Sequence, residues 1–192
     1  DDVENIDFYN SDQALSYQKA DSVGNMKTIL MELPSGVKTE WAYKEIFRPV
    51  NGTPYSVSVT NVPKDTINHV PSFDRLVVRN IKTGTAFQID SIGYYTLYNE
   101  GRSIVFVHRQ AKGNALCYGP LTGPYQTIYQ SPVKKEPASF SLNTKRMTGE
   151  FCVKDSLWYN FSLKKNTCDL VFDRKNIVLP TGMELVRASL SH

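Results

Sequence analysis

Few side chains in this sequence have the types and spacing for acid–base or metal chemistry. Of the three histidines, His69, His108 and His192, only His69 lies in a polar, loop-like stretch, "NVPKDTINHVPSF", shortly after Asp65. A histidine and a carboxylate in one loop can bind a metal ion or exchange a proton when further groups converge on them. The sequence offers no such further groups. We therefore expect no catalytic residue, metal site or cofactor, and keep Asp65 and His69 as candidate contacts for a partner or substrate.

Other chemistries lack their sequence signatures. The chain contains no G-x-S-x-G pentapeptide, which presents the nucleophile of α/β-hydrolases, and no phosphate-binding or calcium-binding loop. Its three cysteines, Cys117, Cys152 and Cys168, are too far apart in the sequence to match the spacing of a zinc site. The sequence predicts that they are buried thiols that pack as small apolar groups.

Tyrosines are the remaining candidates for binding. The stretches "GYYTLY" (93–98) and "GPYQTIYQ" (123–130) place several tyrosines on strand-like segments, where alternation exposes some of them. Exposed tyrosines anchor many interfaces, but tyrosines on neighbouring strands also pair across a sheet. We interpret both stretches as cross-strand pairs first.

Composition favours strands and argues against two classes of partner. The 192 residues are 41% hydrophobic and include eleven Tyr and nine Phe, which prefer strands. The net charge of +3 comes from 22 basic and 19 acidic residues spread along the chain. Nucleic-acid binding needs a concentrated basic stripe, and a membrane span needs about 18 apolar residues in a row. The sequence shows neither.

The elements that must position these residues form a repeat. Four strand–turn–strand stretches align on their turn residues, Gly36, Gly84, Gly123 and Asn166, which recur at similar intervals along the chain. Glycine and asparagine are the residues that best accept positive φ. Apolar residues occupy the same aligned positions before and after each turn, as in hairpins that bury one face.

Two further strand-like stretches precede each hairpin, so the unit is four antiparallel strands over about 40 to 48 residues, as in a β-propeller blade. We predict an all-β, β-propeller-like fold of about four blades, either a partial or a four-bladed propeller, and keep a β-sandwich as the alternative. The chain is one propeller region (1–192) with blades at 4–42, 43–91, 92–131 and 136–173. Residues 174–192 are expected to start a further blade or to provide a closing strand.

The second repeat carries an insertion. Its upstream turn at Asn51 and its hairpin turn at Gly84 are further apart than the corresponding turns of the other repeats, such as Asn99 and Gly123. The additional residues fall within 61–73, which includes Asp65 and His69. Insertions confined to one repeat are loops, and such loops often carry specificity.

The stretches "GRSIVFVHRQAKGNALCYGPLTGPYQTIYQ" (101–130) and "VKDSLWYNFSLKKNTCDLVFD" (153–173) resemble blades of TolB-like and WD-related propellers. More specifically, they resemble the amino-terminal propeller of prolyl oligopeptidase-family serine peptidases from Bacteroidetes, which include dipeptidyl peptidase-like enzymes. In that family the propeller sits over an α/β-hydrolase domain and restricts which peptides reach its serine. The glutamate pair by which dipeptidyl-peptidase relatives hold an amino terminus has no match here, because no two glutamates are adjacent.

Three hypotheses follow. The first is a non-catalytic propeller region that gates or docks peptide substrate for such a peptidase, with an α/β-hydrolase domain or another protein as its partner. The second is a stand-alone protein-interaction propeller of the cell envelope without enzymatic activity, and the third is an enzyme with an unrecognised site. We expect a periplasmic or envelope location after removal of a leader, with the cytoplasm as the alternative. Open blade edges would also permit self-association.

Overall fold

The chain forms strands arranged in four antiparallel sheets of four strands each, which confirms the predicted all-β fold and its four-stranded unit. In every sheet each strand pairs with its neighbour in the sequence. The computed structural model describes residues 3–9, 14–33, 35–42, 48–50, 52–69, 71–81, 83–154 and 156–176.

The first two sheets contain β1 (Val3–Tyr9), β2 (Ala14–Ala20), β3 (Met26–Glu32) and β4 (Lys38–Ala42), then β5 (Arg48–Pro49), β6 (Tyr55–Val62), β7 (Phe73–Asn80) and β8 (Ala86–Ile89). The third and fourth contain β9 (Ile92–Tyr98), β10 (Ser103–His108), β11 (Ala115–Pro120) and β12 (Gln126–Gln130), then β13 (Ser141–Asn143), β14 (Thr148–Val153), β15 (Leu157–Ser162) and β16 (Thr167–Asp173). The only helix in the described residues, η1 (Arg174–Asn176), has three residues, and no helix there is long and apolar enough to cross a membrane.

The turn that defines the repeat has the conformation that the sequence predicts. Gly36, Gly84, Gly123 and Asn166 have φ of 68°, 73°, 79° and 53°, and each joins the third and fourth strands of its sheet. A side chain at positive φ crowds the following carbonyl, so glycine, or asparagine with its short polar side chain, is selected there.

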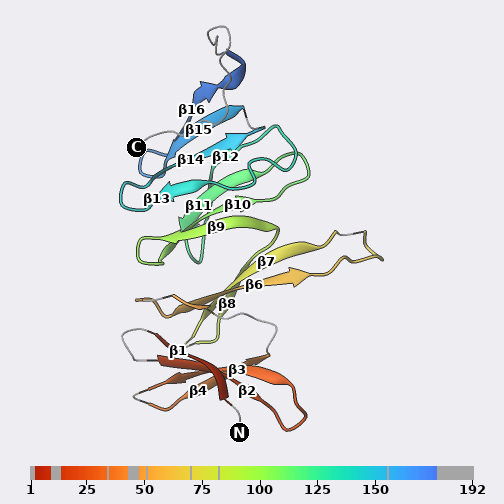
Figure 1. The fold of residues 1–192 in the computed structure, drawn as a ribbon, viewed down its shortest axis with the longest axis vertical. Helices are drawn as coiled ribbons and strands as arrows, with labels where there is room; N and C mark the ends of the chain where they lie inside the picture. Colours follow the sequence, from red (N-terminus) through yellow and green to blue (C-terminus); the bar gives the residue numbers. More distant parts are fainter. Residues whose placement is uncertain are drawn as a thin grey trace, which may run out of the picture.

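The four sheets follow one another along the long axis of the molecule, with β1–β4 at one end and β13–β16 at the other (Figure 1). The last strand of the second sheet leads into the first strand of the third through only Asp90 and Ser91. Such last-to-first connections are typical of successive propeller blades. Because the first and fourth sheets lie at opposite ends, the described residues form an open row of blades.

Two apolar cores hold the last three sheets together. Val57, Leu76 and Val78 of the second sheet pack with Ile104 and Phe106 of the third. The opposite face of the third sheet, with Val105, Val107 and Leu116, packs against Phe151 and Phe161 of the fourth. The third sheet is therefore covered on both faces, which explains why the central residues of β10, "IVFV", are all buried and do not alternate.

The cysteines follow the prediction only in part. Cys117 is buried within the third sheet, but Cys152 and Cys168 are half-buried on the fourth. No disulfide joins any of the three. Only one face of the fourth sheet packs against the third sheet. Side chains on its other face and along its edges therefore stay partly exposed.

Candidate functional site

The predicted contact residues Asp65 and His69 lie in the loop between β6 and β7, at the tip of a hairpin that projects sideways from the row of sheets (Figure 1). Part of the predicted insertion is not loop. Strand pairing runs from Tyr55 opposite Asn80 to Val62 opposite Phe73, so the additional residues lengthen the hairpin as well as its loop.

Asp65 forms hydrogen bonds within its own turn. One carboxylate oxygen accepts the backbone N–H groups of Ile67 at 2.9 Å and Asn68 at 3.0 Å. The other accepts the Asn68 side-chain amide at 2.8 Å. These donors, with the Asn68 side chain contributing most, lower the pKa of Asp65 below its usual 3.8. The carboxylate therefore organises the loop.

His69 is exposed, with a positive φ of 56°, and the structure records no hydrogen bond between its ring and Asp65. In the part of the chain that the structure describes, no three His, Cys, Asp or Glu residues come close enough to hold a metal ion. The structure therefore does not assemble Asp65 and His69 into one site. A role for either in contacting a partner stays a prediction.

The base of the hairpin is fixed to neighbouring strands by charged side chains. Arg109, after β10, donates to Asp74 of β7 at 3.0 Å. The other oxygen of Asp74 accepts the Asn61 amide at 3.0 Å across the hairpin. Next to them, Arg75 is paired with Asp90, with Nη2 2.9 Å from Oδ2. These contacts set the direction in which the hairpin leaves the second sheet.

A concave feature lies between the second and third sheets, and the sequence contains little indication of it. It is a groove of about 1000 Å³, lined by Val50, Gly52, Val57, residues 93–97 of β9, Glu100 and Gly101. We call it the β5–β9 groove. Its walls come from two successive repeats, so only the packing of two sheets creates it. The sequence signal nearest to it is "GYYTLY", whose tyrosines are interpreted from the sequence as cross-strand pairs.

The walls of the groove are held firmly. The amide of Val50 donates to the carbonyl of Tyr55 at 2.9 Å, and the hydroxyl of Thr53 donates to the carbonyl of Val50 at 2.8 Å. Val50 and Val57 are buried in the core between the two sheets. Gly101 lies so close to Val50 that an added Cβ would be 2.0 Å from the valine Cγ1. These contacts fix the residues that line the groove, so the groove is a pre-formed feature of the fold.

The chemistry of the groove suits an extended, partly apolar ligand. Tyr95 and Leu97 of β9 line the groove, are partly buried and pack against the core between the second and third sheets. The ring of Tyr94 lies on the other face of the third sheet, where it meets Phe140 edge-to-face with centroids 5.1 Å apart. β9 is the edge strand of the third sheet, and an edge strand can pair with an added strand through its outward backbone groups. Glu100 places a carboxylate at the rim. The groove offers apolar surface, an aromatic ring, a strand edge and one negative charge.

No protein-family model matches the sequence, and no curated protein matches it significantly. Solved structures are similar in fold. A prolyl endopeptidase structure matches 91% of this chain at 5% identity, with a TM-score of 0.51, and this chain covers 29% of it. An acylaminoacyl peptidase in complex with Z-Gly-Gly-Phe-chloromethyl ketone matches 90% at 8% identity, with a TM-score of 0.50, and 32% of it is covered. The β-propeller domain of the Trilobed protease from Pyrococcus furiosus matches 71% at 10% identity, with a TM-score of 0.48 and 45% coverage.

At these identities the two peptidase matches with TM-scores of 0.51 and 0.50 show the fold alone. The chain is a propeller domain that resembles those of peptidases, and it spans less than half of each of these three structures. The resemblance expected from the sequence is confirmed at the level of the propeller. Membership of the prolyl oligopeptidase family and an origin in Bacteroidetes stay predictions.

Proposed function

We propose that this chain is a non-catalytic propeller region that docks a peptide segment and gates its access to a serine peptidase of the prolyl oligopeptidase type. The observation that best supports this proposal is the β5–β9 groove, an apolar cleft of about 1000 Å³ that runs along an edge strand. The periplasmic or envelope location and the pairing with an α/β-hydrolase domain rest on the sequence resemblance alone.

The size and composition of the groove favour a peptide over a small metabolite. Its volume is at the upper end of the roughly 300–1000 Å³ range of small-molecule pockets. A peptide laid along β9 would add a strand to the third sheet, so that backbone hydrogen bonds supply affinity and alternate side chains enter the cleft. Tyr95 would contact an apolar or aromatic side chain, and Glu100 would attract a positive group such as a free amino terminus.

Binding of labelled peptides tests the proposal. Fluorescence anisotropy would be measured with a fluorescein-labelled Ala-Ala-Pro-Phe-Ala peptide, carrying either a free or an acetylated amino terminus. We expect saturable binding of both forms, weaker for the acetylated one. Tyr95→Ala should weaken binding about tenfold, because truncating an aromatic anchor typically costs more than about 1 kcal/mol.

Phe87→Ala is the matched control, since Phe87 is a 37% exposed aromatic residue outside the groove. Circular dichroism of both variants would establish that they are folded. Absence of binding by the wild type, or equal losses in the two variants, would contradict docking in the groove. Hydrolysis of succinyl-Gly-Pro-4-nitroanilide by the purified chain would contradict the non-catalytic assignment.

A further inference from the structure

Glu100 has a backbone conformation that a glutamate rarely adopts. It lies in the turn between β9 and β10, where the N–H of Gly101 donates to the carbonyl of Tyr98 at 3.1 Å. Asn99 and Glu100, the two central residues of this turn, have φ of 53° and 54°. Hairpin turns with positive φ at both central positions favour Asn followed by Gly. Asn99 follows this preference, but Glu100 stands where glycine would be less strained.

The packing of the turn holds Glu100 beside the β5–β9 groove. Glu100 and Gly101 both line the groove. Gly101 lies against Val50 of the other wall, since an added Cβ would be 2.0 Å from the valine Cγ1. A second hydrogen bond, from the N–H of Arg102 to the carbonyl of Asn99 at 3.1 Å, closes the turn on its other side. The backbone at residue 100 is therefore fixed at the edge of the groove.

Glu100 is the only charged side chain among the described residues that line the groove. The structure pairs it with Arg102, whose Nη2 is 3.8 Å from its Oε2, which is too long for a hydrogen bond. The Glu100 side chain is 79% exposed and that of Arg102 is 65% exposed. An exposed pair of this kind contributes little, so the carboxylate can still bind a positive group of a ligand.

The walls next to Glu100 are apolar. Val50 and Val57 of the second sheet are buried, and Tyr95 and Leu97 of β9 are partly buried against the same core. Arginine is a side chain that suits both features, because its aliphatic stem packs on apolar surface while its guanidinium reaches a polar group. A guanidinium can also form two parallel hydrogen bonds with one carboxylate and is attracted to an aromatic ring such as that of Tyr95.

We infer that Glu100 determines the specificity of the β5–β9 groove and selects peptides that carry an arginine side chain. The stem of this arginine lies along the apolar walls, and its guanidinium pairs with the Glu100 carboxylate. Strained residues concentrate at functional sites, and ligand binding explains why a glutamate occupies a position that favours glycine. This inference rests on the proposed function, because it requires that the groove docks a peptide.

Two peptides that differ only in charge test the inference. Fluorescence anisotropy would compare fluorescein-labelled acetyl-Ala-Ala-Pro-Arg-Ala with the same peptide in which citrulline, an uncharged analogue of the same shape, replaces arginine. Acetylation removes the amino terminus as another positive group. The arginine peptide should bind about threefold more tightly, as an exposed ion pair allows. In about 0.5 M sodium chloride this preference should shrink, because salt screens the pair.

Two variants separate the charge of Glu100 from its strain. Glu100→Gln keeps the length of the side chain and the strain but removes the charge, so it should bind both peptides equally. Glu100→Asn should lose the preference as well, and it should also shift the urea unfolding midpoint upward, because asparagine accepts positive φ better. A loss of selectivity together with a gain in stability is not expected of a residue with a structural role alone.

The controls match these variants in backbone angle and in charge. Lys154 is exposed and lies outside the groove, with φ of 53°, so Lys154→Asn should raise the urea midpoint and keep the preference for arginine. Asp169→Asn removes an exposed negative charge outside the groove and should also keep it. Circular dichroism would establish that every variant is folded.

Equal affinity of the wild type for the two peptides would overturn the inference while peptide docking itself stands. A preference for arginine that persists in Glu100→Gln, or that is lost equally in Asp169→Asn, would overturn it too. So would a lower urea midpoint of Glu100→Asn, because Glu100 would then occupy its position for stability. Failure of the wild type to bind either peptide would contradict this inference and the proposed function together.

Discussion

The guanidinium of Arg109 lies 3.0 Å from the carboxylate of Asp74 and joins the end of β10 to the start of β7. The two residues are far apart in the sequence: Asp74 lies in the second sheet, and Arg109 directly follows a strand of the third. Asp74 also accepts a hydrogen bond from Asn61 on the opposite strand of the hairpin. A single carboxylate thus ties both strands of the projecting hairpin to the third sheet.

Removing the ion pair between Arg109 and Asp74 should make local opening of the hairpin more frequent without unfolding the protein. Both side chains are partly exposed, and such pairs contribute only about 0.5–1 kcal/mol. Arg109→Gln should therefore leave the global unfolding midpoint nearly unchanged. Cleavage by trypsin after Lys64, in the loop, should become about two- to fivefold faster, as a local opening of that free energy implies. Mass spectrometry of timed digests would follow the cut.

Arg102→Gln is the control for Arg109→Gln, because Arg102 is paired only weakly, at 3.8 Å, with its near neighbour Glu100. It should leave the rate of cleavage after Lys64 unchanged. A large loss of global stability in Arg109→Gln would show that the pair supports the core between the sheets and not the hairpin alone.

Two glycines with similar backbone angles should respond differently to an added methyl group. Gly84 and Gly101 have φ of 73° and 78°, but a Cβ would meet nothing within 4 Å at Gly84 and would overlap Val50 at Gly101. Gly84→Ala should destabilise by about 1 kcal/mol from backbone strain. Gly101→Ala should destabilise by about 2–4 kcal/mol, because overpacking adds to that strain. Urea denaturation measures both, and equal effects would contradict the close contact at Val50.

The acidity of Asp65 should depend on Asn68. The Asn68 amide is the largest cause of the lowered pKa of Asp65, so Asn68→Ala should raise that pKa toward its usual value. Because the folded-state pKa is lowered, the carboxylate stabilises its loop above the unfolded-state pKa, and this contribution is lost as pH falls through the folded-state pKa. Carbon NMR of the carboxyl groups would record the titration.

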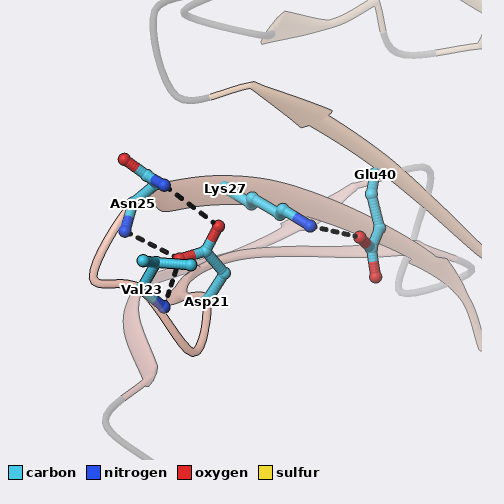
Figure 2. Close-up of polar contacts among 5 residues, drawn as sticks. All are labelled: Asp21, Val23, Asn25, Lys27 and Glu40. Carbon is cyan, nitrogen blue, oxygen red and sulfur yellow. Dashed lines mark hydrogen bonds and ion pairs between the residues drawn. The ribbon is translucent and has the colours of Figure 1, made fainter.

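Asp21 provides an internal reference for that titration. Its pKa is also lowered, mainly by the backbone N–H groups of Asn25 and Val23 in its own turn (Figure 2). Asn68→Ala should leave the titration of Asp21 unchanged. If the pKa of Asp65 stays low in the variant, the backbone N–H groups of Ile67 and residue 68 are sufficient to lower it without the Asn68 side chain.

The thiol of Cys168 should react slowly and should make stability decline in alkali. Burial, with the nearby Asp169 carboxylate adding to it, raises its pKa from 9.0 to about 12. The thiolate population near neutral pH is then about a thousandfold below that of an ordinary thiol, and labelling with Ellman's reagent should be slow until the protein unfolds.

The sign of the alkaline effect follows from the raised pKa. The unfolded chain releases this proton above about pH 9 and the folded chain does not, so stability should fall between pH 9 and about 12. Urea denaturation at increasing pH would measure the slope, and Cys168→Ser should reduce it. An unchanged slope in that variant would assign the effect to other groups, such as the buried tyrosines.

The sequence alone determined the local architecture. A turn that requires positive φ leaves glycine or asparagine at similar intervals, and alternating apolar residues mark the strands on either side. Both signals are local, so the turns at Gly84 and Gly123 and the strands around them were predictable from their own residues. The position of Asp65 and His69 in a loop was predictable for the same reason, because the insertion lengthens the interval between two turn residues of one repeat.

Only the tertiary structure decided how the repeats face one another. The β5–β9 groove has walls from Val57 and Tyr95, which belong to different repeats of the sequence, and no local pattern indicates that a groove opens between the two sheets. The charged pairs across sheets, such as Arg109 with Asp74, depend on the same packing. Tertiary packing also decides which face of a sheet is buried, because a face leaves solvent only where a neighbouring sheet packs on it. Which sheets are neighbours depends on the path of the whole chain.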